Sequence, residues 1–450
     1  MAQSGRTGRL HPAVGAARRR LARHLAEHAG LETTPTGRAA RSAEAVNRAG
    51  RGEQSPASSS RTPRAPAAPR ADEGPLLLVA CSGGPDSLAL AALTAHFARR
   101  GDLRAGAIVV DHGLQEGSAQ VARRAAEQCR ELGLAPVLIR RAEVEPGGHG
   151  PEMAARIARY RAFEEAVAEL EEQGETVAGI LLGHTRDDQA ETVLLGLARG
   201  SGTRSLAGMP PARPLAELGI DGEPITAPRD EPATASIATA SGEPPRVDPE
   251  GAAEAPSAPT ALLLRPLLGT TREEIEQILT AEGLSPWRDP SNADTSLRRN
   301  LVRHDVLPHL ERTLGPGIAQ ALARTAEVLT EDADLLDALA ARRAQDARAD
   351  PGRFHPVPEQ PLAALSLGVL ANTHPALRRR ILAAALQEAG GAAPTHERLA
   401  ALEELLGGRG NAGPVQMPGR VTVWRRRALE RRAPEPEAAG ALILTRTPAG

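Results

Sequence analysis

The seven residues CSGGPDS at 81–87 combine the groups that a phosphate-binding turn needs. Gly83 and Gly84 let the backbone turn tightly and approach a ligand without an obstructing Cβ. The first amides and the dipole of a helix that follows them favour an anion, and two serine hydroxyls add donors. The carboxylate of Asp86 would repel a phosphate unless a cation lay between them, which predicts a Mg²⁺ bridge. The predicted phosphate-binding residues are Ser82, Gly83, Gly84, Pro85, Asp86 and Ser87.

Two better-known phosphate loops do not fit this stretch. The G-x-x-x-x-G-K-[ST] loop requires a lysine, and the chain has none, so all 54 of its Lys and Arg residues are arginine. The G-x-G-x-x-G pattern of dinucleotide-binding folds is missing as well. A capped Gly-rich turn is the plain structural alternative, and the complete S-G-G-x-D-S pattern favours phosphate binding over it.

Four further stretches combine acidic, basic and imidazole side chains at short spacing. They are VVDHGL (109–114), with Asp111 and His112; EMAARIARY (152–160), with Arg156 and Arg159; GHTRDDQAET (183–192), with His184, Asp187, Asp188 and Glu191; and RDPSNADTSLRRNLVRH (288–304). Asp187 and Glu191 are four residues apart and share one face of a helix. The structural alternatives are helix capping by the acids and surface ion pairing by the arginines.

Apolar runs and helical periodicity alternate from residue 75 onward. They predict strands at 75–81, 105–113, 135–144, 176–184 and 261–268, and helices at 86–99, 117–132, 151–173, 186–199 and 271–283. This alternation is typical of a doubly wound, parallel α/β sheet. Such sheets bind ligands at the carboxyl edge of their strands, where Asp111 and His112 are expected.

The flanking segments predict the remaining organisation of the chain. An amphipathic helix at 10–28 precedes a Ser-, Ala-, Pro- and Arg-rich stretch at 29–72, which predicts a disordered insert within 1–74. The Pro- and Thr-rich residues 212–260 predict a surface insertion in the catalytic domain 75–300, near the mouth of the active site. Helices predicted at 317–347, 376–389 and 395–406 and a hairpin at 414–431 indicate a smaller, mainly helical domain over 301–432, with a loose tail at 433–450.

Composition excludes several classes of protein. The 54 basic and 56 acidic residues leave a net charge of −2 in 450 residues, so no overall field attracts nucleic acid or membrane. Six aromatic residues are too few to coat a single strand by base stacking. Two cysteines, Cys81 and Cys129, exclude a disulfide framework. The sequence contains no secretory leader and no apolar run long enough for a bilayer, which predicts a cytoplasmic protein without a membrane partner.

Together, these motifs resemble those of the tRNA(Ile)-lysidine synthetase family of PP-loop ATP pyrophosphatases. SGGPDS is similar to the pyrophosphatase loop of that superfamily, and DHGL, EMAARIARY, GHTRDDQAET, RPLL (265–268) and DPSNADTSLRRNLVRH are similar to the patterns of the family. The resemblance covers 10–28, 75–211 and 261–310 and is thinner over 311–450. It implies an adenine nucleotide alpha hydrolase-like PP-loop domain that uses ATP. The two inserts depart from the common pattern.

The resemblance also implies a two-step ligase reaction. The ring carbonyl oxygen of the wobble cytidine, position 34 of the tRNA(Ile) with a CAU anticodon, attacks the α-phosphate of ATP and releases pyrophosphate. The ε-amine of free L-lysine then attacks the activated ring carbon and releases AMP. The product, lysidine, changes codon reading from AUG to AUA.

The implied roles of individual residues follow the matched motifs. Asp86 and Asp188 are expected to contact Mg²⁺, and Asp187, Asp188 and Glu191 to hold the lysine ammonium or to remove its proton. His184 is expected at a phosphate oxygen. Asp111, His112, Arg156 and Arg159 are expected at the nucleotide. The expected RNA-binding residues are Arg265, Arg298, Arg299, Asn300 and Arg303.

Three other functions stay open as alternatives. A tRNA thiolase would need reactive cysteines, whereas Cys81 lies within a predicted strand. An ammonia-dependent amide synthetase would need an amidotransferase partner, and the sequence contains no segment of that kind with a cysteine nucleophile. A scaffold that only binds RNA would have a degraded loop, whereas Asp86 and both loop serines are intact. The sequence leaves open whether the chain forms a homodimer.

Overall fold

The computed structural model describes residues 10–31, 33, 74–113, 117–144, 151–200, 202–215, 261–356, 360–429 and 439–447. The chain divides into two units, of which the first ends at Thr330 and the second begins at Glu331. The insert predicted at 29–72 lies outside the described residues except for 29–31 and 33. Within the described residues, no helix has the length and apolar character needed to cross a bilayer.

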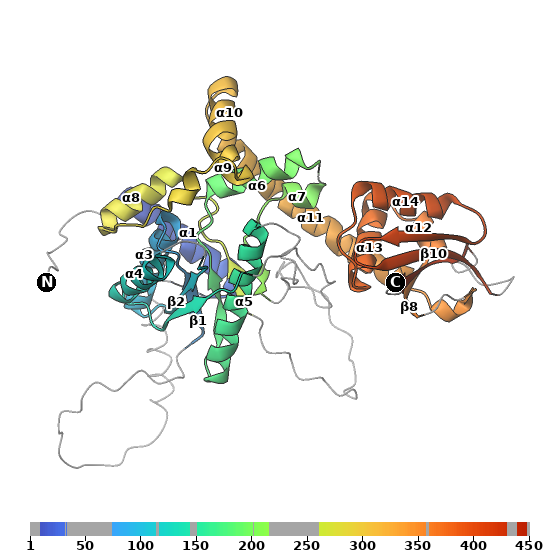
Figure 1. Ribbon diagram of the computed structural model, residues 1–450, viewed down its shortest axis with the longest axis horizontal. Helices are drawn as coiled ribbons and strands as arrows, with labels where there is room; N and C mark the ends of the chain where they lie inside the picture. Colours follow the sequence, from blue (N-terminus) through green and yellow to red (C-terminus); the bar gives the residue numbers. More distant parts are fainter. Residues whose placement is uncertain are drawn as a thin grey trace, which may run out of the picture. The chain divides into compact units, whose positions relative to one another are not determined.

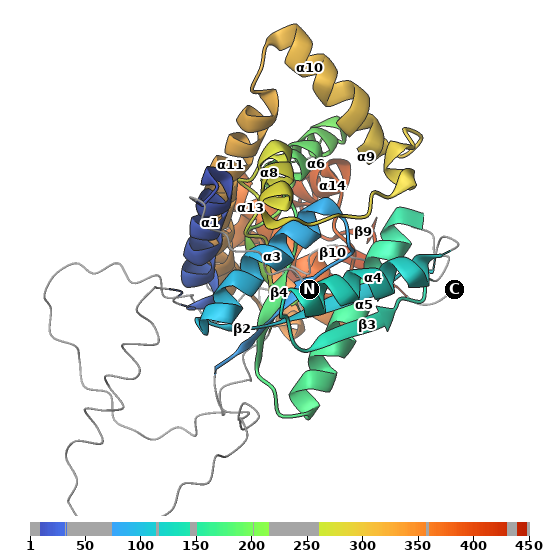
Figure 2. The same cartoon turned by 90° about the vertical axis from the view of Figure 1, so that its left-hand side faces the viewer.

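A six-stranded sheet forms the centre of the first unit (Figures 1 and 2). Its strands are β1 (Leu76–Ala80), β2 (Arg104–Asp111), β3 (Val137–Arg141), β4 (Val177–Leu181), β5 (Ala212–Pro214) and β6 (Leu262–Leu264), in the order β3-β2-β1-β4-β6-β5. All neighbouring strands are parallel except β5, which is antiparallel to β6. The strand order reverses between β1 and β4, and open α/β sheets bind their ligands at such a switch point. The predicted doubly wound sheet is confirmed.

Helices cover both faces of this sheet. One face packs against α1 (Pro12–Ala29), α3 (Pro85–Arg100), α4 (Ser118–Glu131) and α8 (Arg272–Glu282), in a core that includes Leu77 and Val79 of β1. The opposite face packs against α5 (Pro151–Glu172), in a core that includes Leu76 and Leu78. Successive side chains of a strand point to opposite faces, so a strand covered on both sides is apolar throughout.

The last part of the first unit packs on α6 (Arg186–Ala198). This part contains α9 (Arg298–Leu301), a π-helical turn (Val302–Val306), α10 (Leu307–Leu314) and the beginning of α11 (Ile318–Ala347), and the short helix α7 (Thr203–Leu206) follows α6 directly. Ala190 of α6 shares a small core with Leu307 and Ala319. Residues 301–330 therefore belong to the first unit, whereas the sequence placed the domain boundary at 300.

Of the insertion predicted at 212–260, only residues 212–215 lie within the described residues. Residues 212–214 form β5, which contradicts the prediction for these positions. The Leu215 amide donates to the Ala261 carbonyl oxygen at 2.8 Å, so both ends of the insertion lie where β6 begins. The beginning of β6 is at the amino edge of the parallel sheet, opposite the loops that follow β1 and β4. The prediction that the insertion emerges near the active-site mouth is wrong for these ends.

The second unit combines helices with a small antiparallel sheet. Its strands are β7 (Phe354–His355), β8 (Pro361–Ser366), β9 (Ala412–Met417), β10 (Val421–Ala428) and β11 (Ala441–Arg446), in the order β7-β10-β11-β8 with β9 on β10. The helices are α12 (Leu367–Ala371), α13 (Pro375–Glu388), α14 (His396–Gly407) and the rest of α11. The predicted hairpin is confirmed as β9 and β10. The expectation of a loose tail is wrong for 441–446, because Leu442 and Leu444 are buried against the helices.

Burial of His24 in α1 predicts an acid-sensitive fold. Burial and the neighbouring charges of His28 and Arg265 lower the pKa of His24 to about 4. The unfolded chain binds this proton near pH 6.5, so the stability from the neutral ring is lost as pH falls from about 6.5 to 4. By linkage, the loss is about 2 kcal/mol at pH 5. Urea unfolding at pH 7.5 and 5.0 measures this loss of stability. The free energy of unfolding should fall less between the two pH values in His24→Gln than in the wild type. An equal fall in both proteins would contradict the role of His24.

Candidate active site

The loop CSGGPDS connects β1 to α3, as its sequence predicts. Gly83 has a φ of +79°, and a Cβ at this position would lie 3.1 Å from the Cβ of Ala125. Both the conformation and the space therefore require glycine. α3 begins at Pro85 with Gly84 as its N-cap, and no side chain caps its first turn. This leaves the first amides of α3 for a ligand, which is the arrangement that binds phosphate at a helix N-terminus.

The two serines hold the loop in this shape. The Ser87 hydroxyl accepts from the Ser82 amide at 3.2 Å and donates to the Gly84 carbonyl at 3.1 Å. Gly183, which follows β4, packs directly on the loop, because a Cβ there would lie 3.0 Å from the backbone nitrogen of Ser87. This close approach brings the GHTRDDQAET stretch next to the phosphate loop.

Asp86 lies half-buried in the first turn of α3. Burial and the negative charges of Asp188 and Asp187 raise its pKa to about 6, although two arginines oppose this shift. A carboxylate held among like charges is stabilised by a cation, and its oxygens are ligands that Mg²⁺ prefers. The described residues contain no group of three or more side chains that could hold a metal. The site thus fits a Mg²⁺ ion held by one or two carboxylates and the phosphates of a nucleotide.

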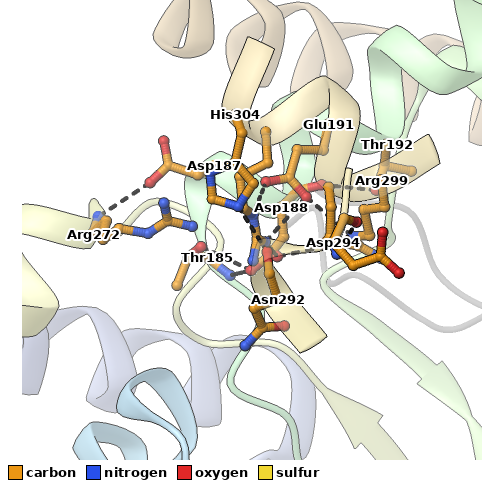
Figure 3. Close-up of polar contacts among 12 residues, drawn as sticks. Thr185, Asp187, Asp188, Glu191, Thr192, Arg272, Asn292, Asp294, Arg299 and His304 are labelled. Atoms are coloured by element: carbon orange, nitrogen blue, oxygen red, sulfur yellow. Dashed lines mark hydrogen bonds and ion pairs between the residues drawn. The ribbon is translucent and has the colours of Figure 1, made fainter. Parts of the chain in front are cut away.

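Two acids of α6 face two arginines from a distant part of the chain (Figure 3). Arg299 donates from Nε to Glu191 at 3.0 Å and from Nη2 to Asp188 at 3.3 Å. Arg303 donates from Nε to Glu191 at 2.6 Å and from Nη2 to Asp188 at 2.8 Å. The acids are three residues apart and the arginines four, so each pair lies on one helical stripe.

This network occupies both oxygens of Asp188. The Asp188 Oδ1 accepts from the two arginines, and Oδ2 accepts from the amide and the hydroxyl of Thr185, at 2.8 Å each, as a helix cap. Burial favours the protonated acid, but the positive charges of Arg299 and Arg303 and the amide hydrogen bond from Thr185 outweigh burial and hold the pKa of Asp188 below its usual value. Asp86 is therefore a more open carboxylate for Mg²⁺ than Asp188.

The structure places the residues predicted for RNA binding in three different environments. Arg299 and Arg303 point to the acids of α6 instead of outward. Asn300 is buried, and its Nδ2 donates to the carbonyls of Ser291 and Asp294 at 3.0 and 2.9 Å, which holds the preceding loop. Of the residues predicted to bind RNA, only Arg298 is exposed; it lies at the start of α9. The sequence did contain a signal for the ion pairs with α6, because the two acids and the two arginines each have helical spacing.

Asp187 lines a cavity of about 440 Å³ next to this network. Its Oδ2 accepts from the Arg272 amide at 3.2 Å. The cavity exceeds the roughly 30 Å³ of one water molecule many times over. It is lined by Asp187, Glu191, Arg272, Arg303, Leu307, Pro308, Glu311, Arg312 and Ala319. A lining with side chains of both signs suits a ligand that carries both charges.

The carboxyl ends of β2 and β4 carry two neutral histidines. Asp111 ends β2 and accepts from the Gly113 amide at 3.0 Å, and His112 follows it, as predicted. Burial lowers the pKa of His112 to about 4 and that of His184 well below its usual value. Their Nδ1 atoms are buried and have no hydrogen-bond partner in the part of the chain described. The Nδ1 atom of each ring can therefore donate a hydrogen bond to a ligand at this edge of the sheet, or accept one from it.

Arginines gather around Tyr160 of α5. The guanidinium carbon of Arg156 lies 5.3 Å from the centre of the Tyr160 ring. Arg265 is only 2% exposed and donates from Nη1 to the Pro210 carbonyl at 2.8 Å, so it cannot reach a surface-bound RNA as predicted. Arg159 and Arg213 also act on Tyr160 by charge. Arg213 was not predicted as a site residue, because it lies in a three-residue strand within the predicted insertion, where the sequence shows no periodicity.

Comparisons with known proteins agree with this geometry. A model of the PP-loop domain matches residues 61–231 and 233–310, and a model of the TilS substrate binding domain matches 365–429. The tRNA(Ile)-lysidine synthase of Salinispora tropica is 43% identical over 357 residues, which are 79% of this chain and 89% of the relative. That of Leifsonia xyli is 43% identical over 358 residues, with the same shares. That of Streptomyces coelicolor is 39% identical over 353 residues, 78% of this chain and 83% of the relative.

Proposed function

The chain belongs to the tRNA(Ile)-lysidine synthase family, and from this premise we propose how its residues divide the work of an ATP-dependent ligase acting on tRNA(Ile). One observation carries the proposal: the PP-loop with its half-buried carboxylate follows β1 at the switch point of the sheet, and α6, which follows β4, lines a cavity that has side chains of both charges. The loop and the carboxylate serve the activation step, and the cavity serves the transfer to lysine.

In the activation step, the ring carbonyl oxygen of the wobble cytidine forms a bond to the α-phosphorus of ATP, and the bond to pyrophosphate breaks. The amides at the start of α3 and the Ser82 hydroxyl bind the oxygens of the leaving pyrophosphate. Neutral His184 and His112 lie at the neighbouring strand ends, where each can donate a hydrogen bond to a phosphate oxygen. Asp111 and Arg159 lie at the same edge.

Mg²⁺ held by Asp86 would neutralise charge on the phosphates as pyrophosphate leaves. The fit rests on the position of Asp86 in the first turn of α3 beside the phosphate loop, where burial and the charges of Asp188 and Asp187 disfavour an uncompensated carboxylate. Asp188 contributes by position, because its two hydrogen bonds from Thr185 fix the first turn of α6 beside the phosphate loop.

In the transfer step, the ε-amine of free lysine forms a bond to the activated ring carbon, and AMP leaves. The cavity beside Asp187 suits lysine, which carries a carboxylate and two amines. We assign the lysine α-carboxylate to Arg312 and Arg272, and an ammonium group to Asp187. Glu191 is less suited to this role, because two guanidiniums already occupy its oxygens.

Removing the charge of Arg312 should weaken lysine binding selectively. We expect Arg312→Gln to raise the KM for lysine about tenfold, because a charge-assisted hydrogen bond contributes about 1.5–3 kcal/mol. The KM for ATP should stay unchanged. Lysinamide lacks the carboxylate, so its KM should be the same in both proteins. An equal rise for lysine and lysinamide would refute the assignment of Arg312.

The proposed function is tested by incorporation of labelled lysine into tRNA(Ile) with a CAU anticodon, in the presence of Mg-ATP. A transcript with uridine in place of the wobble cytidine is the control. We expect incorporation that needs both ATP and the cytidine. Pyrophosphate release on another acceptor without lysine incorporation would retain the activating loop and reject the lysine transfer. The thiolase alternative is disfavoured, because Cys81 and Cys129 are buried at 2% and 0% exposure.

A further inference from the structure

The only two cysteines of the chain meet beside the phosphate loop. Cys81 begins the loop, directly before Ser82, and Cys129 lies on α4. Both thiols are free, and both belong to the core between the sheet and its helices, at 2% and 0% exposure. A side-chain hydrogen bond joins the two sulfurs. Neither sulfur has a part in the proposed reaction, so the reaction does not explain their contact.

The two thiols of this pair differ in acidity. The hydrogen bond from Cys129 holds the pKa of Cys81 below its usual value, although burial opposes the shift, and further hydrogen bonds from the Gly83 backbone and Ser87 act in the same direction. The contact with Cys81 and burial raise the pKa of Cys129. A thiolate is the form that attacks an oxidant, and an acidic thiol beside a second thiol is typical of cysteines that form reversible disulfides.

The packing between α4 and the loop is tight. The Cys81 amide donates to the Ile108 carbonyl of β2 at 2.9 Å, which holds Cys81 in the sheet. Ala125 lies one helical turn before Cys129 on the same stripe of α4. It fills the space beside Gly83, because a Cβ at Gly83 would lie 3.1 Å from the Cβ of Ala125. A movement of Cys129 toward Cys81 therefore presses Ala125 against Gly83.

We propose that Cys81 and Cys129 are a modification site at which a peroxide forms a disulfide that switches off nucleotide binding, an inference that rests on the proposed function only in that the loop binds ATP. A disulfide holds its sulfurs about 2 Å apart, which is much shorter than a hydrogen bond between them. Closing this bond draws α4 toward the start of the loop, and Gly83 must give way to Ala125. The loop amides then lose the positions in which they bind phosphate.

The chemistry is a two-electron oxidation of the pair by hydrogen peroxide. The Cys81 thiolate attacks one peroxide oxygen, the O–O bond breaks, and the hydroxide that leaves takes up a proton and becomes water. The Cys129 sulfur then attacks the sulfenic acid of Cys81, the S–O bond breaks, and the oxygen leaves with the thiol proton as a second water. Burial keeps a tRNA base away from both sulfurs, whereas a molecule of two oxygen atoms can enter when the loop opens locally beside the exposed Ser82.

The test compares the full chain before and after a brief treatment with hydrogen peroxide. Intact mass detects the disulfide as a loss of two hydrogen atoms, and titration after unfolding counts the free thiols. Affinity is measured by fluorescence anisotropy for an ATP analogue that cannot be cleaved between the α- and β-phosphates. Cys129→Ala, which lacks the second thiol, is the matched control, and Cys81→Ala is the second variant. Melting temperatures verify folding, and dithiothreitol is finally added to each sample.

We expect the oxidised wild type to lose both free thiols and to bind the analogue at least about tenfold more weakly, the effect of losing one charge-assisted hydrogen bond. Dithiothreitol should restore both the thiols and the affinity. The two variants form no internal disulfide, so they should keep the affinity of the reduced wild type after the same treatment. A saturating concentration of the analogue should slow disulfide formation in the wild type, because binding favours the closed loop.

Three results would overturn the inference. A folded wild type that keeps both thiols, at a dose that oxidises them in urea, would show that burial protects the pair. A disulfide that leaves the affinity unchanged would show that the loop does not depend on the pair. An equal loss of affinity in the two variants would place the oxidative damage elsewhere. Failure of the reduced wild type to bind the analogue would reject ATP binding by the loop, and the mass and thiol counts would still decide whether the disulfide forms.

Discussion

Asp86→Asn should abolish lysidine formation while the protein remains as stable as the wild type or becomes more stable. The carboxylate is half-buried, and burial together with Asp188 and Asp187 raises its pKa to about 6, so the folded state disfavours its ionised form. An amide of the same shape removes this unfavourable charge. It also removes the proposed Mg²⁺ ligand beside the transferred phosphate, for which we expect at least about a hundredfold loss of kcat.

This prediction is checked by rates of pyrophosphate release and lysine incorporation, together with thermal melting at neutral pH. Asp305→Asn is the control, because it makes the same charge change at an exposed position of the π-helical turn. Binding of tRNA(Ile) should change by no more than a few fold in either variant. Retained pyrophosphate release in Asp86→Asn would reject the metal assignment. A large fall in melting temperature would show that Asp86 has a structural role.

Glu191→Gln should lower the free energy of unfolding of the first unit by about 3 kcal/mol, because losing one member of a buried ion pair leaves the other charge uncompensated. Glu191 is fully buried and accepts from Arg299 and Arg303 at 3.0 and 2.6 Å. A glutamine turns one acceptor into a donor that faces guanidinium donors. Asp188 still contacts both arginines, so the unit should remain folded.

Urea unfolding at neutral pH measures this effect. The matched control is Asp346→Asn, in an exposed pair with Arg343 at 2.9 Å, where the side chain of Asp346 is 60% exposed. Exposed pairs contribute about 0–1 kcal/mol, so this variant should be nearly neutral. The double variant Glu191→Gln/Arg303→Gln should lose less than the sum of the single variants, since the two side chains interact directly. A Glu191→Gln protein as stable as Asp346→Asn would contradict the buried network.

Much of the first unit could be predicted because its signals are local. Its strands are short, uniformly apolar runs, since both faces of the sheet are covered, and its helices show their period over ten or more residues. The structure of the second unit was harder to predict from the sequence. β11 is a six-residue run after a Pro- and Ala-rich stretch, and its burial depends on pairing with β8 and β10. The sequence pattern also could not show that α10 packs on α6, which moved the domain boundary.

The candidate site divides in the same way. The residues of the phosphate loop, including the glycine that must adopt a positive φ, were evident from the sequence because a turn is formed by neighbours. The sequence did not show which residues the charged side chains contact. Arg299 and Arg303 have the spacing of a basic helix face, and nothing local distinguishes a face that meets RNA from one that meets Asp188 and Glu191.

The sequence by itself determined the PP-loop, the alternation of most strands and helices in the first unit, the acids and histidines at the strand ends, and the resemblance to one family. Only the tertiary structure decided that two arginines neutralise the acids of α6, that Arg265 is buried, and that Arg213 joins it beside Tyr160. The physical reason is that periodicity specifies which face a side chain occupies. What that face meets depends on packing between segments far apart in the chain, and a buried charge must find its counter-charge there.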